Sequence, residues 1–253
     1  MSPTSPGRLV VLSGPSCAGK SPLAKALARF HPDLFRCFQP LVLYNSRDPR
    51  PGEADGLDYH FRTRSQVEAL RSNNRYAVLD VRGDLQALDL EEVTELSSRG
   101  DVFFEGNPMV GQTLLSHSSL KGFPKLSAFL APLSAEEITF LKTHGRNVNL
   151  KDLVTDMMRR KLLRRTRRQK GELSLKDLEN IERRAGNAYA ELRLAHHFEH
   201  VIPNHDGEDS ENWDAFCCPL GDARKSQNAF AALLEGRPSP YLEKWAADLL
   251  PEL

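Results

Sequence analysis

The residues that decide the predicted fold are Gly14-Pro15-Ser16-Cys17-Ala18-Gly19-Lys20-Ser21. The apolar run Leu9–Leu12 precedes them, and a helical pattern that includes Leu23 and Leu27 follows. A strand, the pattern Gly-x-x-x-x-Gly-Lys-Ser and a helix, in that order, are typical of a phosphate-binding P-loop. Glycines let successive backbone N–H groups turn toward phosphate oxygens, and the positive end of the following helix adds to the attraction. We therefore predict that residues 14–21 bind the phosphates of ATP; the alternative is a chance glycine-rich turn.

Two positions within or after this loop predict metal-assisted phosphate chemistry. Lys20 is expected to reach the β- and γ-phosphates, and the Ser21 hydroxyl is expected to hold Mg²⁺. An acid at the end of a core strand often completes such a magnesium site, and Glu105 ends the apolar run 101–105. Asp80, after the apolar run 76–79, is the rival. For either acid the alternative is a carboxylate that is satisfied at a strand terminus without any metal.

The bulk composition excludes several classes of protein. The chain has 253 residues, with 34 Lys plus Arg and 34 Asp plus Glu, so no overall charge favours nucleic acid or a membrane surface. Four cysteines at this length do not form the disulfide framework of a secreted protein. The first residues lack the apolar core of a signal peptide, and no stretch approaches a membrane span. A cytoplasmic protein is expected.

A second motif occupies residues 45–61, after the apolar run 41–44, which we expect to be a strand. Arg47 and Arg50 stand three residues apart in a loop that is stiffened by prolines. Two such planar donors suit a dianionic phosphate, and the Tyr59 hydroxyl can add a neutral donor. The alternative is a surface turn rich in proline and glycine whose charges are solvated.

This segment resembles the guanylate kinase family, whose pattern around the phosphate of GMP is T-T-R-x-P-R-x-G-E-x-x-G-x-D-Y-x-F. The matching residues are Arg47, Pro49, Arg50, Gly52, Glu53, Gly56, Asp58, Tyr59 and Phe61. Together with the P-loop, the match covers about the first 75 residues well and the remainder only in outline. The resemblance implies that Arg47, Arg50 and Tyr59 hold the phosphate of an acceptor nucleotide. It also implies that Arg184 points toward that phosphate and that Asn204 lies near the adenine of the donor.

The chain departs from the family pattern between Arg75 and Asp89. The glutamate that reads guanine would fall near Val78, and the family's Gly-x-x-Tyr-Gly-Thr/Ser turn is absent. Leu43 stands where the family has a serine. Loss of base-reading partners relaxes or changes a choice of base, so the acceptor base need not be guanine. Asp80, Asp84 and Asp89 are candidates for a different set of contacts to the acceptor.

The predicted fold is a P-loop NTPase fold of the α/β class, with three α/β/α layers and a parallel central sheet. We expect a guanylate kinase-like domain over residues 1–205, with an acceptor-binding insertion at 41–90 and a lid at 143–180. Residues 206–253 are expected to form a helical extension with helices over 223–235 and 240–250. This extension could pack on the core or make an oligomer contact, such as that of a homodimer.

A run of eight cations lies within residues 159–170, on a stretch with a helical apolar face. Three interpretations compete for it. It could be a lid whose arginines close over the transferred phosphate, a nucleic-acid patch, or a solvated helix face. The lid is the interpretation that the P-loop context favours, while the balanced overall charge speaks against nucleic acid.

The function predicted from these observations is transfer of the γ-phosphate of ATP to a nucleoside monophosphate, or to another small phosphorylated acceptor. Catalysis would come from positioning and charge neutralisation by Lys20, Arg47, Arg50, Arg184 and Mg²⁺. One alternative is a binding module that has lost turnover, and another is a P-loop kinase that acts on a nucleic-acid end. The intact Lys20-Ser21 pair speaks against the binding module, because such a module has no use for it.

Overall fold

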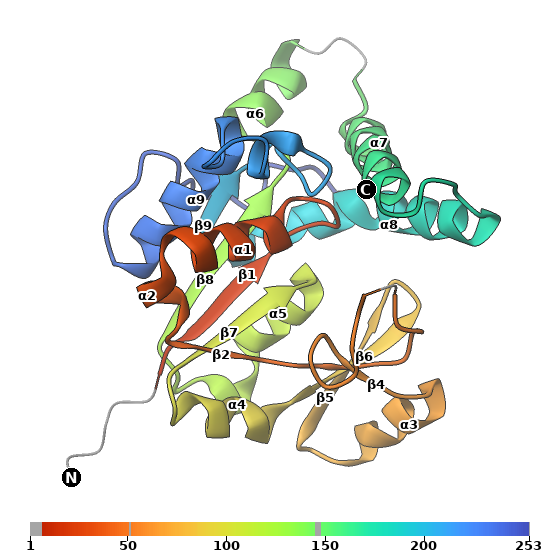
Figure 1. The fold of residues 1–253 in the computed structure, drawn as a ribbon, viewed down its shortest axis with the longest axis vertical. Helices are drawn as coiled ribbons and strands as arrows, with labels where there is room; N and C mark the ends of the chain where they lie inside the picture. The colour runs from red at the N-terminus through yellow and green to blue at the C-terminus, as the bar shows by residue number, and fades with distance from the viewer. Residues whose placement is uncertain (1–6, 51, 145–147, 253) are drawn as a thin grey trace. The chain divides into compact units, whose positions relative to one another are not determined.

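The structure is a computed structural model that describes residues 7–50, 52–144 and 148–252. The chain divides into two compact units, which are described separately (Figure 1). The first comprises the chain up to Val11, Cys37–Phe104 and Met109–Leu126, and the second comprises Leu12–Arg36, Glu105–Pro108 and Ser127–Leu253. No helix in the described ranges combines the length and the apolar character that crossing a membrane would require.

The larger sheet has five strands in the order β2-β7-β1-β8-β9. Their bounds are Phe38–Pro40, Asp101–Gly106, Leu9–Ser13, Lys125–Ala131 and His200–Pro203. β2 pairs with β7 in parallel, and β8 pairs with β9 in parallel. Every residue of β1 is buried, as expected of a strand that is covered on both faces of a parallel sheet. The predicted α/β fold with a parallel central sheet is thereby confirmed.

A smaller sheet lies within the first unit, with four strands in the order β4-β3-β6-β5. These are His60–Phe61, Tyr44–Asn45, Asp84–Asp89 and Tyr76–Val81. β5 and β6 form a hairpin whose two turn residues, Arg82 and Gly83, both have positive φ, as a tight two-residue turn requires. Helix α3 (Arg64–Ala69) begins with a capping box at Thr63 and continues into η1 (Leu70–Ser72). It buries Val67 against the sheet residues Leu85 and Ala87.

The remaining helices follow from amphipathic or capped segments. They are α1 (Lys20–Phe30), α2 (Pro32–Phe35), α4 (Leu90–Ser97), α5 (Pro108–Ser116), α6 (Ala135–His144), α7 (Leu150–Lys170), α8 (Leu175–Arg193) and α9 (Gly221–Leu234). Short 3₁₀ turns are η2 (Ser118–Leu120), η3 (Leu194–His197) and η4 (Glu211–Trp213). α7 and α8 pack side by side (Figure 1). Ser174 caps α8 with its hydroxyl, in a capping box with Asp177.

Three expectations about the elements differ from the structure. The strand expected over 41–44 is limited to Tyr44–Asn45. Helix α5 was not expected from the sequence. Residues 240–250 do not form the expected helix; Glu243 instead exchanges two backbone hydrogen bonds of 2.8 Å with Val201. Trp245 and Leu250 are buried in this non-helical segment, so tertiary packing overrides the helix that their spacing predicts.

Candidate active site

The backbone of the P-loop is held in a shape that only glycine permits at two positions. A Cβ atom at Gly14 would meet the Leu130 carbonyl oxygen at 2.4 Å. Gly19 has φ +100°, and a Cβ there would lie 2.6 Å from Asn204 Nδ2 and 2.7 Å from the Asp206 carbonyl oxygen. These close approaches give the Gly-x-x-x-x-Gly spacing a physical reason in this chain.

Lys20 is the first residue of α1, and its side chain is buried, with 8% exposed. The ammonium group donates hydrogen bonds of 2.9 and 2.8 Å to the carbonyl oxygens of Gly14 and Pro15. The charge therefore lies inside the curve of the loop, where a phosphate group would be bound.

Ser21 and Glu105 meet as the sequence suggested. The Ser21 hydroxyl donates a 2.6 Å hydrogen bond to Glu105 Oε1, so the start of α1 and the end of β7 bring the two oxygens together. Burial raises the pKa of Glu105, and the Ser21 hydrogen bond and the charge of Lys20 partly oppose that rise. A hydroxyl and a carboxylate are the hard oxygen donors that suit Mg²⁺. The rival acid, Asp80, lies in the first unit, where it accepts a hydrogen bond from the Gly83 N–H and faces Arg64 at 3.8 Å.

Two further predicted residues contact the P-loop from the second unit. Arg184 of α8 is buried, and its Nε donates a 3.0 Å hydrogen bond to the Ser16 hydroxyl. Asn204, which follows β9, is fully buried and donates to the carbonyl oxygens of Ala18 and Asp206 at 2.8 and 2.7 Å. Its amide thus ties the end of β9 to the phosphate-binding loop, and a contact between Asn204 and adenine stays a prediction.

The acceptor motif forms a compact charged loop in the first unit. Arg47 makes a bidentate pair with Glu53, with distances of 2.6 and 2.7 Å, and Glu53 also accepts from the Arg50 N–H at 2.8 Å. The Arg47 guanidinium lies over the rings of Tyr59 and Phe61, at 5.1 and 5.4 Å from their centroids. Burial alone would raise the pKa of Glu53, but the hydrogen bonds and charges of the two arginines outweigh it and leave that pKa lowered.

The region that departs from the family pattern is mostly structural in this chain. Val78 packs against the apolar cluster of α3 and β6, and Leu43 is buried. Asp89 caps α4 and pairs with Arg75 at 2.6 Å. These side chains therefore contribute to the unit's own packing and pairing.

Asn45 is a candidate that sequence reasoning missed. Its side chain is fully buried beside Gln86, its register partner on β6. Its Oδ1 accepts from the Arg47 N–H, whereas its Nδ2 has no hydrogen-bond partner among the described residues. A buried donor without a partner costs free energy and is often satisfied by a ligand or by water. No feature of the sequence around position 45 distinguishes it from an ordinary turn asparagine.

The basic run lies on α7, and many of its charges have partners. Arg159 pairs with Glu182 of α8 at 2.7 Å, and Lys170 pairs with Asp177 at 2.5 Å. Lys161 and Arg165 are largely buried rather than solvated, and they face the loop that follows β9. The acids that face Lys161 and Arg165 lie more than 40 residues downstream, so no local pattern in the basic run indicates these two contacts.

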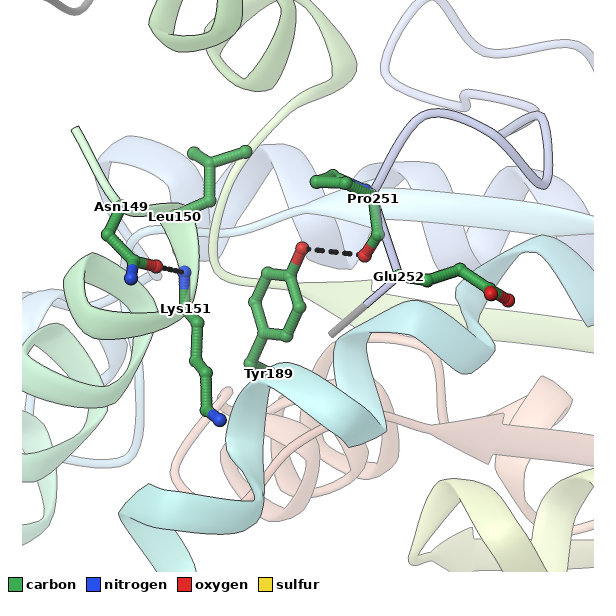
Figure 2. A pocket seen from close by; sticks show the side chains of 6 residues that line it. All are labelled: Asn149, Leu150, Lys151, Tyr189, Pro251 and Glu252. Carbon is green, nitrogen blue, oxygen red and sulfur yellow. Dashed lines mark hydrogen bonds between the residues drawn. The ribbon is translucent and has the colours of Figure 1, made fainter. Parts of the chain in front are cut away.

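The structure also contains a pocket of about 340 Å³ at the start of α7 (Figure 2). Its lining residues are Asn149, Leu150, Lys151, Tyr189, Pro251 and Glu252. The Tyr189 hydroxyl donates a 3.0 Å hydrogen bond to the Pro251 carbonyl oxygen across this pocket. None of the residues predicted to bind nucleotide lines it.

Comparisons with known proteins agree with this geometry. A family model described as guanylate kinase matches residues 6–100. A guanylate kinase from Corynebacterium jeikeium (strain K411) is 31% identical over 204 residues, which cover 79% of this chain and 89% of that protein. A guanylate kinase from Ruegeria sp. (strain TM1040) is 31% identical over 207 residues, covering 81% and 80% of the two chains. The crystal structure of guanylate kinase from Anaplasma phagocytophilum has the same fold, with a TM-score of 0.51 at 18% identity over 92% of this chain and 87% of the other.

Proposed function

The chain belongs to the guanylate kinase family, and on that premise we infer that it is an ATP-dependent nucleoside monophosphate kinase. The observation that carries this function is the P-loop in which Lys20 is buried against the loop carbonyls while Ser21 meets Glu105. A module that only bound a partner would gain nothing from burying this lysine beside a hydroxyl–carboxylate pair. The reaction needs no covalent intermediate with the protein, because positioning and charge neutralisation suffice.

On the donor side, we propose that residues 14–21 hold the phosphates of ATP and that Lys20 neutralises the transferred group. Arg184 is already directed at Ser16 of the loop and adds a second buried cation to this side. Ser21 and Glu105 would hold Mg²⁺, whose role when bound is to neutralise charge between the phosphates. Asn204 keeps the loop in place through its hydrogen bond to the Ala18 carbonyl oxygen.

On the acceptor side, we propose that Arg47, Arg50 and Tyr59 bind the phosphate of the nucleoside monophosphate. Glu53 holds the Arg47 guanidinium over the two aromatic rings, so the planar donor loses little freedom when a phosphate arrives. Asp80, at the β5–β6 hairpin, is kept as a candidate contact to the acceptor.

The base of the acceptor is proposed to differ from the family's usual choice. Val78 and Leu43 replace polar side chains of the family pattern and are packed apolar residues here. The buried Nδ2 of Asn45 offers a neutral donor in the same small sheet. A neutral amide is compatible with several bases, whereas a carboxylate favours the paired donors of guanine.

A panel of monophosphates tests this proposal. GMP, AMP, CMP, UMP and ribose 5-phosphate are each incubated with Mg·ATP, and formation of ADP is measured. We expect turnover on at least one nucleotide and its loss in Lys20→Ala. Lys121→Ala, a matched change at an exposed lysine, should leave turnover intact.

Two outcomes would contradict the proposal. ATP binding without turnover on any acceptor would indicate a binding module. Turnover only on oligonucleotide ends, with a steep decline as salt rises, would indicate a nucleic-acid kinase.

A further inference from the structure

The loop that follows β9 supplies acids to the basic helix α7. Arg165 pairs with Glu208 at 2.7 Å, and Arg164 pairs with Asp209 at 2.7 Å. Lys161 lies 3.9 Å from the same Asp209 carboxylate. Glu208 and Asp209 are largely buried, with 14% and 5% of their side chains exposed. Arg165 is also largely buried, at 15%, so its pair with Glu208 is not a solvent-screened surface pair, whereas Arg164 is 59% exposed.

Backbone carbonyls of the same loop also accept from α7. Lys161 donates to the His205 carbonyl oxygen, and Arg168 donates to that of Asp209 at 2.9 Å. Residues 205–209, which we call the acidic loop, therefore bind α7 from Lys161 to Arg168, over about two helical turns. Four of the eight cations of the basic run are used in this way.

The acidic loop also packs against the P-loop. A Cβ at Gly207 would meet the Cys17 carbonyl oxygen at 2.2 Å, and Cys17 Sγ lies 3.9 Å from Asp209 Oδ1. Trp213 also holds the acidic loop in place, because its indole N–H donates to the carbonyl oxygens of Asp206 and Gly207 at 2.9 and 3.1 Å. The two acids are thus anchored beside the residues that are proposed to hold phosphate.

The charge of Glu208 is stabilised by the cations around the P-loop. Burial alone would raise the pKa of Glu208, but Arg165, Lys20 and Arg184 outweigh burial and leave that pKa lowered. Glu208 also contributes to the raised pKa of Glu105. A carboxylate in this position weakens the positive potential that an arriving phosphate meets, since like charges repel strongly in a partly buried site.

We propose that Glu208 is a built-in anion that occupies the phosphate-binding cations and that the phosphates of the donor nucleotide displace it. This inference rests on the proposed function of the P-loop. Displacement frees Arg165 from its pair with Glu208, so that arrival of the donor is coupled to release of this arginine of α7. The partner of the basic run is thus the acidic loop of the same chain. The sequence leaves three interpretations of this run open: a lid, a nucleic-acid patch or a solvated helix face.

The opposite role for Glu208 is a clamp that holds Arg165 in place for the phosphates. The two roles predict opposite signs for one isosteric change. If Glu208 competes with phosphate, then Glu208→Gln strengthens ATP binding; if it positions Arg165, the same change weakens ATP binding.

Equilibrium binding of Mg·ATP, inorganic triphosphate and adenosine to the full chain separates these roles. For Glu208→Gln we expect ATP and triphosphate to bind about tenfold more tightly, which is about 1.4 kcal/mol, and adenosine to bind unchanged. Glu211→Gln, a matched neutralisation at an exposed acid on the same segment, should change none of the three. Unchanged or weaker binding of triphosphate by Glu208→Gln would overturn the proposal.

A measurement on the unmodified chain covers the case in which the variant does not fold. Hydrogen exchange at residues 205–210 should become faster when Mg·ATP is added, because Glu208 leaves Arg165 and the loop loses that contact, and adenosine should leave it unchanged. Slower exchange with ATP would show that the acids act as a clamp. The two possible failures are distinguishable. If Lys20→Ala binds ATP as well as the unmodified chain, the P-loop assignment fails; if ATP binding needs Lys20 but is not strengthened in Glu208→Gln, only the role of Glu208 fails.

Discussion

Glu53 orders the acceptor loop through its contacts with two arginines. Its carboxylate binds the Arg47 guanidinium in a bidentate pair and accepts from the Arg50 N–H. The same geometry presents Arg47 over two aromatic rings, where a planar cation is favoured. The arginines supply the charge for a phosphate, while the glutamate determines where that charge is held.

Substitution Glu53→Gln tests this positioning role. Loss of a charge-assisted bidentate pair costs about 1.5–3 kcal/mol, so we expect KM for the acceptor to rise about 10- to 100-fold. KM for ATP should be unchanged, since the P-loop is untouched. Glu68→Gln, at an exposed acid of α3 that pairs with Arg71 of η1, is the control and should have no effect. An equal rise in KM for both substrates would point to a folding defect instead.

The pH dependence of the acceptor site follows from the same residue. The pKa of Glu53 is lowered in the folded chain, so its stabilising contribution is present above the unfolded value and is lost as pH falls through the folded value. We expect acceptor affinity, measured at fixed ATP, to fall only as pH drops through the lowered pKa of Glu53, below the usual range of a glutamate carboxyl. In Glu53→Gln this particular decline should disappear, and its persistence would assign the titration to another group.

Gly19 can be tested against a glycine that has room for a side chain. Gly19→Ala places a methyl group 2.6 Å from Asn204 Nδ2 at φ +100°, so we expect ATP binding to be lost or greatly weakened. Gly122→Ala, where a Cβ meets nothing within 4 Å, should bind ATP normally. Isothermal titration of both variants gives the comparison, and normal binding by Gly19→Ala would mean that the loop adapts.

At the scale of elements, the stability of α7 and α8 depends on the residues at their ends as well as on their buried faces. α8 begins at a capping box and α7 ends at Gly171, which has φ +75°. Gly186, by contrast, lies exposed within α8, where glycine is a poor helix former. A Cβ at Gly171 or Gly186 meets nothing within 4 Å, so backbone conformation alone distinguishes the two positions.

The two glycines therefore make a matched pair for stability. Gly186→Ala should stabilise the chain by about 0.5–1 kcal/mol, because alanine favours the helix and restricts the unfolded chain. Gly171→Ala should destabilise it by about 1–2 kcal/mol, because an L-residue is strained at positive φ. Urea unfolding followed by circular dichroism measures both. The same sign for both variants would refute the backbone explanation.

At the scale of the whole molecule, a net charge of zero conceals a strong segregation of charge along the chain. The cations gather in residues 159–170, and several of the acids that match them lie at 208–209. The composition shows only that the numbers of cationic and acidic residues are equal. These residues pair because the loop that follows β9 lies against α7 in the folded chain.

Nucleotide binding should stabilise the folded chain as a whole. At a concentration of 100 times Kd, a ligand that binds only the folded state contributes about 2.7 kcal/mol, which is about 5–10 °C in Tm for a chain of this size. We expect this shift with Mg·ATP, a smaller shift with ATP and EDTA, and none with Lys20→Ala, by differential scanning fluorimetry. An equal shift with adenosine would exclude phosphate binding as its source.

The sequence by itself determined the P-loop, the acceptor motif and the α/β class, because each depends on residues that are close together in the chain. Residues 14–21 and 47–61 carry their spacing, their glycines and their charges locally. Comparison with the family pattern also identified Leu43 and Val78 as positions where this chain differs from it. Helices with a clear apolar face and a polar cap, such as α8, were expected for the same local reasons.

Only the tertiary structure decided which distant side chains meet. Arg184 reaches Ser16 across 168 residues, and Arg165 reaches Glu208 across 43. Such contacts depend on packing that no local period encodes. The failure of the expected helix over 240–250 has the same origin, because its backbone bonds to β9 and its buried residues Trp245 and Leu250 lie outside any helix. The P-loop could therefore be predicted from its own residues, whereas the position of Glu208 beside it could not.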